Sequence, residues 1–247
     1  MLTIKKALRL RSGQAINKII LKRVLSITLL SILLIGMVYF TLMPAVIEAT
    51  YPAAGPVSVV ASLSVTKEID ITAPSNFSLT PSIPGMSGNL GSPSSASAAF
   101  TVISNAAAGF DMKIYASQAY ALYLGTPTDQ YFSDYAPVAA STPDFAWQSP
   151  AAAAAWFGYS VGAGTSADAD QEFKNASSAC NASGGANSTA NCFFGMTTTP
   201  GTRIIHRTSY TSSTGETETV KFLAESNQAF LKEGTYTATI TATVSTN

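Results

Sequence analysis

The two cysteines, Cys180 and Cys192, have the clearest chemistry in this chain of 247 residues. They enclose eleven residues rich in Asn, Ser, Ala and Gly, a loop with little apolar surface to order it. The spacing is not that of a Cys-x-x-Cys redox pair, and no Lys, Arg or His flanks either thiol to activate it. We therefore predict a structural disulfide, which contributes about 3 kcal/mol in the chain-entropy model if the chain leaves the cytosol.

A short acidic run is the weak candidate for a metal site. Asp168, Asp170 and Glu172 alternate with other residues, and Ca²⁺ takes several carboxylate oxygens from short loops of this kind. The spacing and the glycine of an EF-hand loop are missing. A solvated acidic loop is therefore the favoured interpretation, and we predict no metal site.

The sequence contains few sets of residues whose types and spacing would suit catalysis. Asp129 with Asp134, or Glu216 with Glu218, have the residue types of an acid/base pair for glycoside cleavage, but a chain with 14 acidic residues contains such pairs by chance. His206 is the one histidine, and no Gly-x-Ser-x-Gly elbow supplies a nucleophile for it. Phosphate-cradling and dinucleotide-binding glycine motifs are also absent from the sequence. We predict a protein that is not an enzyme and has no cofactor.

Aromatic side chains gather in the middle third of the chain. Tyr131, Tyr135, Trp147 and Trp156 belong to this group, and exposed aromatic rings are typical of sugar-binding and protein-binding faces. The same rings could equally pack a loop onto the core. Both interpretations stay open at this point.

The N-terminus predicts export. Residues 1–23 hold seven basic and no acidic side chains, and residues 24–47 then run without a charge, about 36 Å if helical. Because positive flanks stay in the cytoplasm, residues 50–247 should face outward. We expect 24–49 to be a signal peptide or an uncleaved signal anchor that holds the chain in the membrane.

Charge and composition exclude one class of partner. The chain has 14 basic and 14 acidic residues, so the part after residue 23 keeps seven bases against 14 acids, a net of −7. A nucleic-acid binder needs a basic face for phosphate, so no nucleic-acid partner is predicted.

The exported part is predicted to be all-β. Short runs with period-two alternation are separated by Pro, Gly, Ser and Thr, which indicates about 7–9 strands in a two-sheet antiparallel sandwich. The expected insertions are residues 119–155 and 162–200, and residues 81–98 are expected to be a flexible connector. The expected strands are 59–66, 100–103 paired with 110–116, 156–161, 203–207, 219–224 and 235–244.

A resemblance follows from the order of these segments. The chain resembles exported immunoglobulin-like, pilin-like β-sandwich proteins of bacterial surfaces, including the spore-coat-U type. The segments that carry this resemblance are 57–65, 71–80, 99–105 with 109–115, 156–161 and 233–244, the last of which reads EGTYTATITATV. The resemblance covers most of residues 57–244 through short motifs. It implies an immunoglobulin-like sandwich displayed at the cell surface, with a terminal strand at the C-terminal end.

Two functions are expected from these patterns. The first is a structural cell-surface protein, a pilin-like filament subunit that self-associates by strand exchange, because an open sheet edge is a template for pairing. The second is a surface adhesin that binds glycans or proteins through its aromatic insertion. The expected strand-exchange segment is defined by its alternating apolar residues Val57, Val59, Ala61, Leu63 and Val65.

Overall fold

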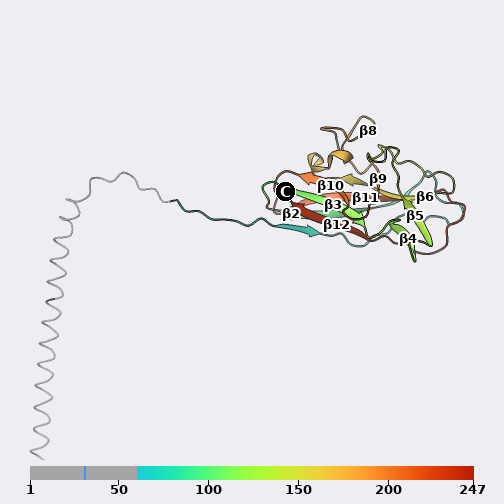
Figure 1. The fold of residues 1–247 in the computed structure, drawn as a ribbon, viewed down its shortest axis with the longest axis horizontal. Helices are drawn as coiled ribbons and strands as arrows, with labels where there is room; N and C mark the ends of the chain where they lie inside the picture. Colours follow the sequence, from blue (N-terminus) through green and yellow to red (C-terminus); the bar gives the residue numbers. More distant parts are fainter. Residues whose placement is uncertain (1–30, 32–59) are drawn as a thin grey trace, which may run out of the picture. The chain divides into compact units, whose positions relative to one another are not determined.

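The computed structural model describes Ser31 and residues 60–247 (Figure 1). Residues 65–247 form one compact unit, and residues 1–64 belong to another. The expected basic leader 1–23 and the expected helix 24–49 lie outside the described residues, apart from Ser31. Among the residues that are described, no helix is long and apolar enough to cross a membrane.

The larger sheet has seven strands. Its order is β1, β2, β11, β6, β5, β4, and the short β9 pairs with β6 near the middle of the sheet. Its strands are β1 (Ile69–Thr72), β2 (Ser94–Ser104), β4 (Leu122–Leu124), β5 (Gln130–Asp134), β6 (Ala155–Gly162), β9 (Phe194–Gly195) and β11 (Glu216–Ser226).

The smaller sheet has three strands, in the order β10, β3, β12. The segment between β6 and β9 adds two short 3-10 helices and a small separate hairpin. These elements are β3 (Phe110–Ala116), β10 (Thr202–Arg207), β12 (Ile240–Thr246), η1 (Ser166–Asp168), η2 (Gln171–Phe173), β7 (Asn175–Ala176) and β8 (Ala179–Cys180).

The core lies between the two sheets, because side chains alternate between the faces of a strand. Phe110, Met112 and Ile114 of β3 are fully buried and share one hydrophobic cluster with Val102 of β2 and Phe222 of β11. Burying a large apolar side chain contributes about 1.5–3 kcal/mol. Residues 65–247 are therefore all-β with two sheets on one core, consistent with a β-sandwich.

The expected pairing of β2 with β3 is wrong. β2 is hydrogen-bonded to β1 and β11, whereas β3 is hydrogen-bonded to β10 and β12. Both edges of each strand are occupied, so neither can accept the other. Residues 105–109 therefore carry the chain from one sheet to the other.

The expected insertion 119–155 contributes to the larger sheet. It contains β4 and β5, and β5 pairs with β6 in parallel, which corrects the expectation of a purely antiparallel sandwich. A parallel pair needs a crossover connection of a dozen or more residues, and residues 135–154 provide it. The expected connector 81–98 is also partly wrong, because β2 begins at Ser94.

The expected first strand, 59–66, is not formed in its described part. Residues 60–66 have no regular secondary structure, and β1 begins only at Ile69. Val59 lies outside the described residues. Residues 60–66 have no strand partner among the described residues.

Candidate functional site

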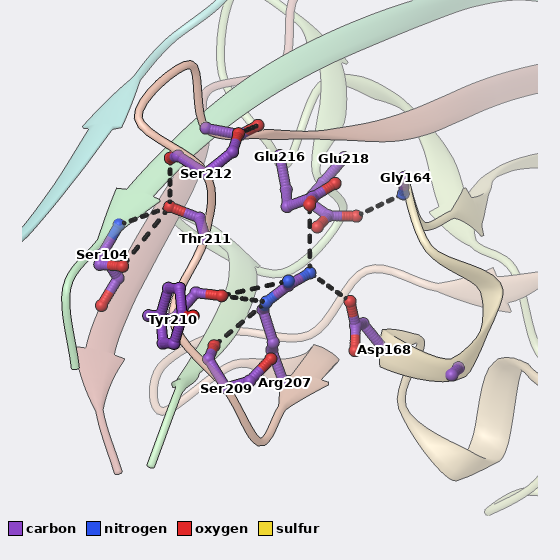
Figure 2. Close-up of polar contacts among 12 residues, drawn as sticks. Ser104, Gly164, Asp168, Arg207, Ser209, Tyr210, Thr211, Ser212, Glu216 and Glu218 are labelled. Atoms are coloured by element: carbon purple, nitrogen blue, oxygen red, sulfur yellow. Dashed lines mark hydrogen bonds and ion pairs between the residues drawn. The ribbon is translucent and has the colours of Figure 1, made fainter. Parts of the chain in front are cut away.

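A polar cluster lies where β11 begins (Figure 2). Glu216 and Glu218 are two residues apart and thus point to the same face of β11, the face that Val220 and Phe222 turn to the core. Glu218 is fully buried and Glu216 is partly exposed. The alternation of β11 thus places the carboxyl group of Glu218 on the same face as the apolar side chains of Val220 and Phe222.

Arg207, the last residue of β10, is the cation of this cluster. Its Nη1 lies 2.6 Å from Oδ2 of Asp168 and 3.3 Å from Oε1 of Glu216. Its Nε donates to the carbonyl of Ser209 at 3.0 Å, and its Nη2 donates to the carbonyl of Tyr210 at 3.1 Å. One guanidinium thus holds the end of η1, the start of β11 and the loop after β10 together.

Only one of the two carboxyl oxygens of Glu218 has a hydrogen-bond partner among the described residues. Its Oε2 accepts a hydrogen bond from the backbone N–H of Gly164 at 2.9 Å, while its Oε1 is buried without a hydrogen-bond partner. Burial raises the pKa of Glu218 from 4.5 to about 7, against the lowering effect of the Gly164 hydrogen bond. The nearby charges of Asp168 and Glu216 raise this pKa further, and Arg207 lowers it.

Gly164 can approach Glu218 because it has no side chain. A Cβ atom at this position would lie 2.7 Å from the carbonyl oxygen of Thr217, closer than real contacts allow. Only glycine therefore lets the chain that follows β6 lie against the start of β11 and donate to the buried carboxyl.

The cluster is tied to the end of the sandwich. The Ser104 N–H, at the end of β2, donates to Oγ1 of Thr211 at 3.0 Å in the loop after β10. Nδ2 of Asn247 donates to the carbonyl of Arg207 at 2.8 Å. The Arg207 loop thus lies where β2 and β12 both end.

The arrangement suits proton binding better than metal binding or hydrolysis. In the part of the chain that the structure describes, no group of three or more His, Cys, Asp or Glu residues could hold a metal ion. Glu218 is buried, so a substrate could not reach it as the acid/base pair with Glu216 would require. A buried carboxyl with a free oxygen can gain or lose a proton.

A second feature is a partly open side of the sandwich. β1 and β12 are neighbours, coloured cyan and red in Figure 1, and among the described strands each is paired along one edge only. The inward residues of β3 are all buried, whereas Ile240, Ala242 and Val244 of β12 pack on the core but stay partly exposed. The core is less well covered here than at its centre.

Phe77 follows β1 in the chain and is also only partly covered. Its ring stacks on the buried Phe222 with the centroids 5.3 Å apart, yet Phe77 remains 44% exposed. Ile69 and Ile71 of β1 also pack against the core while partly exposed. Apolar side chains of this edge therefore face both the core and water.

The residues of the expected strand-exchange segment divide into two groups. Val57 and Val59 lie outside the described residues. Ala61, Leu63 and Val65 are exposed and have no regular secondary structure, with Leu63 90% and Val65 77% exposed. Strand exchange itself stays a prediction.

The aromatic candidates lie in two places. Tyr135 is buried and stacks on Trp147 at 4.5 Å, with Trp156 at its edge, so these three pack onto Leu223 of the larger sheet. Burial and the acceptor Asp144 raise the pKa of Tyr135 well above its usual range. Alanine substitution of Tyr135 or Trp147 would thus remove packing as well as any binding surface.

Tyr131 lies apart from that cluster. Its ring stacks on Tyr120 with centroids 4.0 Å apart, and Tyr120 is 41% exposed. The backbone of Tyr120 is left-handed, with φ 56°, a conformation uncommon for residues other than glycine. The carboxylate of Asp134 accepts the N–H groups of Tyr120 and Ala121 at 3.0 and 3.1 Å and holds this turn.

The acidic run is used in ion pairs. Asp168 is bound to Arg207, and Asp170 is bound to Nε of Arg203 and also caps η2. Burial raises the pKa of Glu172, and the charge of Asp170 raises it further. The arginines of β10 thus bind Asp168 and Asp170, two of the three carboxylates that were weak candidates for Ca²⁺.

The disulfide prediction is confirmed. Cys180 and Cys192 are bonded, and Cys192 is fully buried in the main core. The bond joins β8 to the residue that precedes Phe193, so it fixes the loop between β6 and β9 onto the sandwich.

His206 is partly exposed, and its Nδ1 lies 2.6 Å from Oδ1 of Asp111.

Sequence reasoning underrated Glu218 and did not single out Arg207. A signal for Glu218 was present, since Glu218, Val220, Phe222 and Ala224 share one parity of a single strand. An acid on the apolar side of an alternating strand is a candidate for a buried carboxyl. Arg207 carried no such signal, because its partners come from distant segments.

Comparisons with known proteins bring no relative. The chain matches no family model, no curated protein and no solved structure.

Proposed function

We propose that this chain is a non-enzymatic structural protein of the cell surface that assembles into filaments by strand exchange. Residues 1–23 stay in the cytoplasm, 24–49 form the signal or anchor helix, and 50–247 form an exported, immunoglobulin-like and pilin-like sandwich. The observation that carries the proposal is the apolar face of the segment before β1, whose Leu63 and Val65 lie in water. The disulfide supports an oxidising location.

The donor in this proposal is the segment 57–65, and the acceptor is the side of another copy between β1 and β12. The unpaired edges of β1 and β12 can supply backbone hydrogen bonds to an added strand. Its alternating apolar residues would cover Ile240, Ala242 and Val244, which the chain's own strands leave partly exposed. Each large apolar side chain that becomes buried contributes about 1.5–3 kcal/mol.

The test compares two faces of the same segment. In the full-length chain, purified in detergent micelles, we expect Leu63→Asp with Val65→Asp to abolish filaments seen by negative-stain electron microscopy. Val60→Asp is the matched control, because Val60 is equally exposed at 90% but has the opposite parity. Filaments that survive the double substitution, or disappear equally in the control, would contradict the proposal.

The stacked pair Tyr120 and Tyr131 favours a second function, adhesion to a carbohydrate. An exposed ring that is fixed in position offers a flat apolar face to a sugar at low entropic cost. We expect Tyr120→Ala to weaken binding to a glycan array without loss of thermal stability. Tyr210→Ala is the control, since Tyr210 is 64% exposed and has no ring partner among the described residues. Equal binding by all variants would count against this function.

A further inference from the structure

Two carboxylates share one guanidinium at the start of β11, and a third carboxyl group lies near them. Asp168 and Glu216 are both bound by Arg207, and Glu218 adds a buried oxygen without a partner beside them. We propose that this cluster is a proton-operated latch that holds the segment 163–168 against β11 while Glu218 is neutral and loosens when Glu218 ionises. The inference concerns the monomer and does not depend on filament assembly.

The charge balance of the cluster supplies the driving force. With Glu218 neutral, one cation faces two anions, Asp168 and Glu216. With Glu218 ionised, one cation faces three anions, and the third has one buried oxygen that no donor of the described residues reaches. A buried charge without full hydrogen bonding is costly, so the ionised state favours a conformation that admits water.

In the part of the chain that the structure describes, three charged groups shift the pKa of Glu218, and only one of them, Arg207, is a cation. β2, which pairs with β11 at this level, contains no titratable residue. β6 contributes only Tyr159, which pairs with Phe222 further along β11. The groups that face Glu218 are thus Asp168 from η1, Arg207 from β10 and Glu216 from β11 itself.

The parts that move follow from the contacts. The segment 163–168 is held to β11 by the Gly164 N–H on Glu218 and by Asp168 through Arg207. Ionisation strengthens the first contact but repels Asp168 and Glu216 from Glu218. We therefore expect the Asp168 end of this segment to separate first, followed by the loop that Arg207 holds.

The pH window follows from linkage. A carboxyl whose pKa is raised in the closed state contributes stability that is present below its ordinary pKa of 4.5 and is lost as pH rises to about 7. If opening fully solvates Glu218, the opening equilibrium increases by up to about 300-fold across this window. Above this window the opening equilibrium no longer changes with pH.

Hydrogen–deuterium exchange with mass spectrometry tests the latch in the full-length chain in detergent micelles. After correction for intrinsic exchange, we expect the protection of peptides covering 163–168 to fall by 10-fold or more between pH 4.5 and 7.5. Glu218→Gln, which imitates the neutral acid, should keep high protection at both pH values. Wild-type protection that does not change with pH, or an unchanged dependence in Glu218→Gln, would overturn the proposal.

Two further variants keep the test decisive if Glu218→Gln does not fold. Glu216→Gln removes one repelling charge, so the pH at which protection stops falling should move lower. Glu225→Gln is the control, because Glu225 is equally buried on β11 but is bound by Trp147 and Ser149. A shift in Glu225→Gln and none in Glu216→Gln would also overturn the proposal.

Discussion

Replacing Glu218 by glutamine should remove a pH dependence from the global stability of the protein. The side chain of glutamine has the shape of the neutral acid and can still accept the hydrogen bond from Gly164. It cannot ionise. The variant should therefore behave like the wild type at low pH and exceed it in stability above neutral pH.

The magnitude follows from the pKa of Glu218. Its ordinary value is 4.5, and burial raises it to about 7 in the folded protein. Each pH unit in this window changes the free energy of unfolding by about 1.4 kcal/mol, so the wild type loses roughly 3 kcal/mol between pH 4.5 and 7. Burial also raises the pKa of Glu172 and of Asp134, but both remain in the variant, so the difference isolates Glu218.

Chemical denaturation at several pH values is the assay. We expect the difference in unfolding free energy between Glu218→Gln and the wild type to be near zero at pH 4 and about 3 kcal/mol at pH 8. A difference that is the same at both pH values would refute the reasoning, because an effect on packing alone does not titrate.

Three other variants test the fold. Serine in place of both Cys180 and Cys192 should lower the unfolding free energy by about 3 kcal/mol, measured by denaturation, and an unchanged value would mean that the loop is ordered without the bond. Gly109→Ala should cost more than about 1 kcal/mol in a thermal melt, because φ is +81° and the new Cβ would lie 2.0 Å from the carbonyl oxygen of Arg207. Phe222→Ala should cost about 3–5 kcal/mol in urea denaturation, since its ring lies in the core and stacks on Phe77; a loss below 1 kcal/mol would contradict this packing.

Alternation predicted strands well where a strand has one buried face. The strands expected at 156–161, 203–207 and 219–224 are present as β6, β10 and β11, because their apolar periods reflect a real core. The alternation of 59–66 is weaker but also predicted a strand, and its described part forms none. A period of two shows that a segment could lie on a core and does not show which chain provides that core.

Strand pairing could not be predicted from local pattern. The short turn 105–109 suggested a hairpin, yet β2 and β3 lie in different sheets because β1, β11, β10 and β12 occupy their edges. Pairing depends on segments that are distant in the sequence, about which the local alternation contains no information.

The candidate site was only partly predictable. Parity could have marked Glu218 as a buried acid. Its raised pKa, however, depends on Asp168 and Arg207, which different loops bring to it. Of the expected site residues, Asp168 is held in that ion pair, while Tyr135 and Trp147 pack onto the sheet.

Cross-linking between copies tests the central claim, strand exchange, most directly. One full-length chain would carry Leu63→Cys and a second would carry Ala242→Cys, on the partly exposed inward face of β12. The native cysteines are already bonded to each other. After the two variants are mixed and oxidised, the account predicts a disulfide-linked dimer that contains one chain of each kind. It would be contradicted if the oxidised mixture contained no dimer with one chain of each kind.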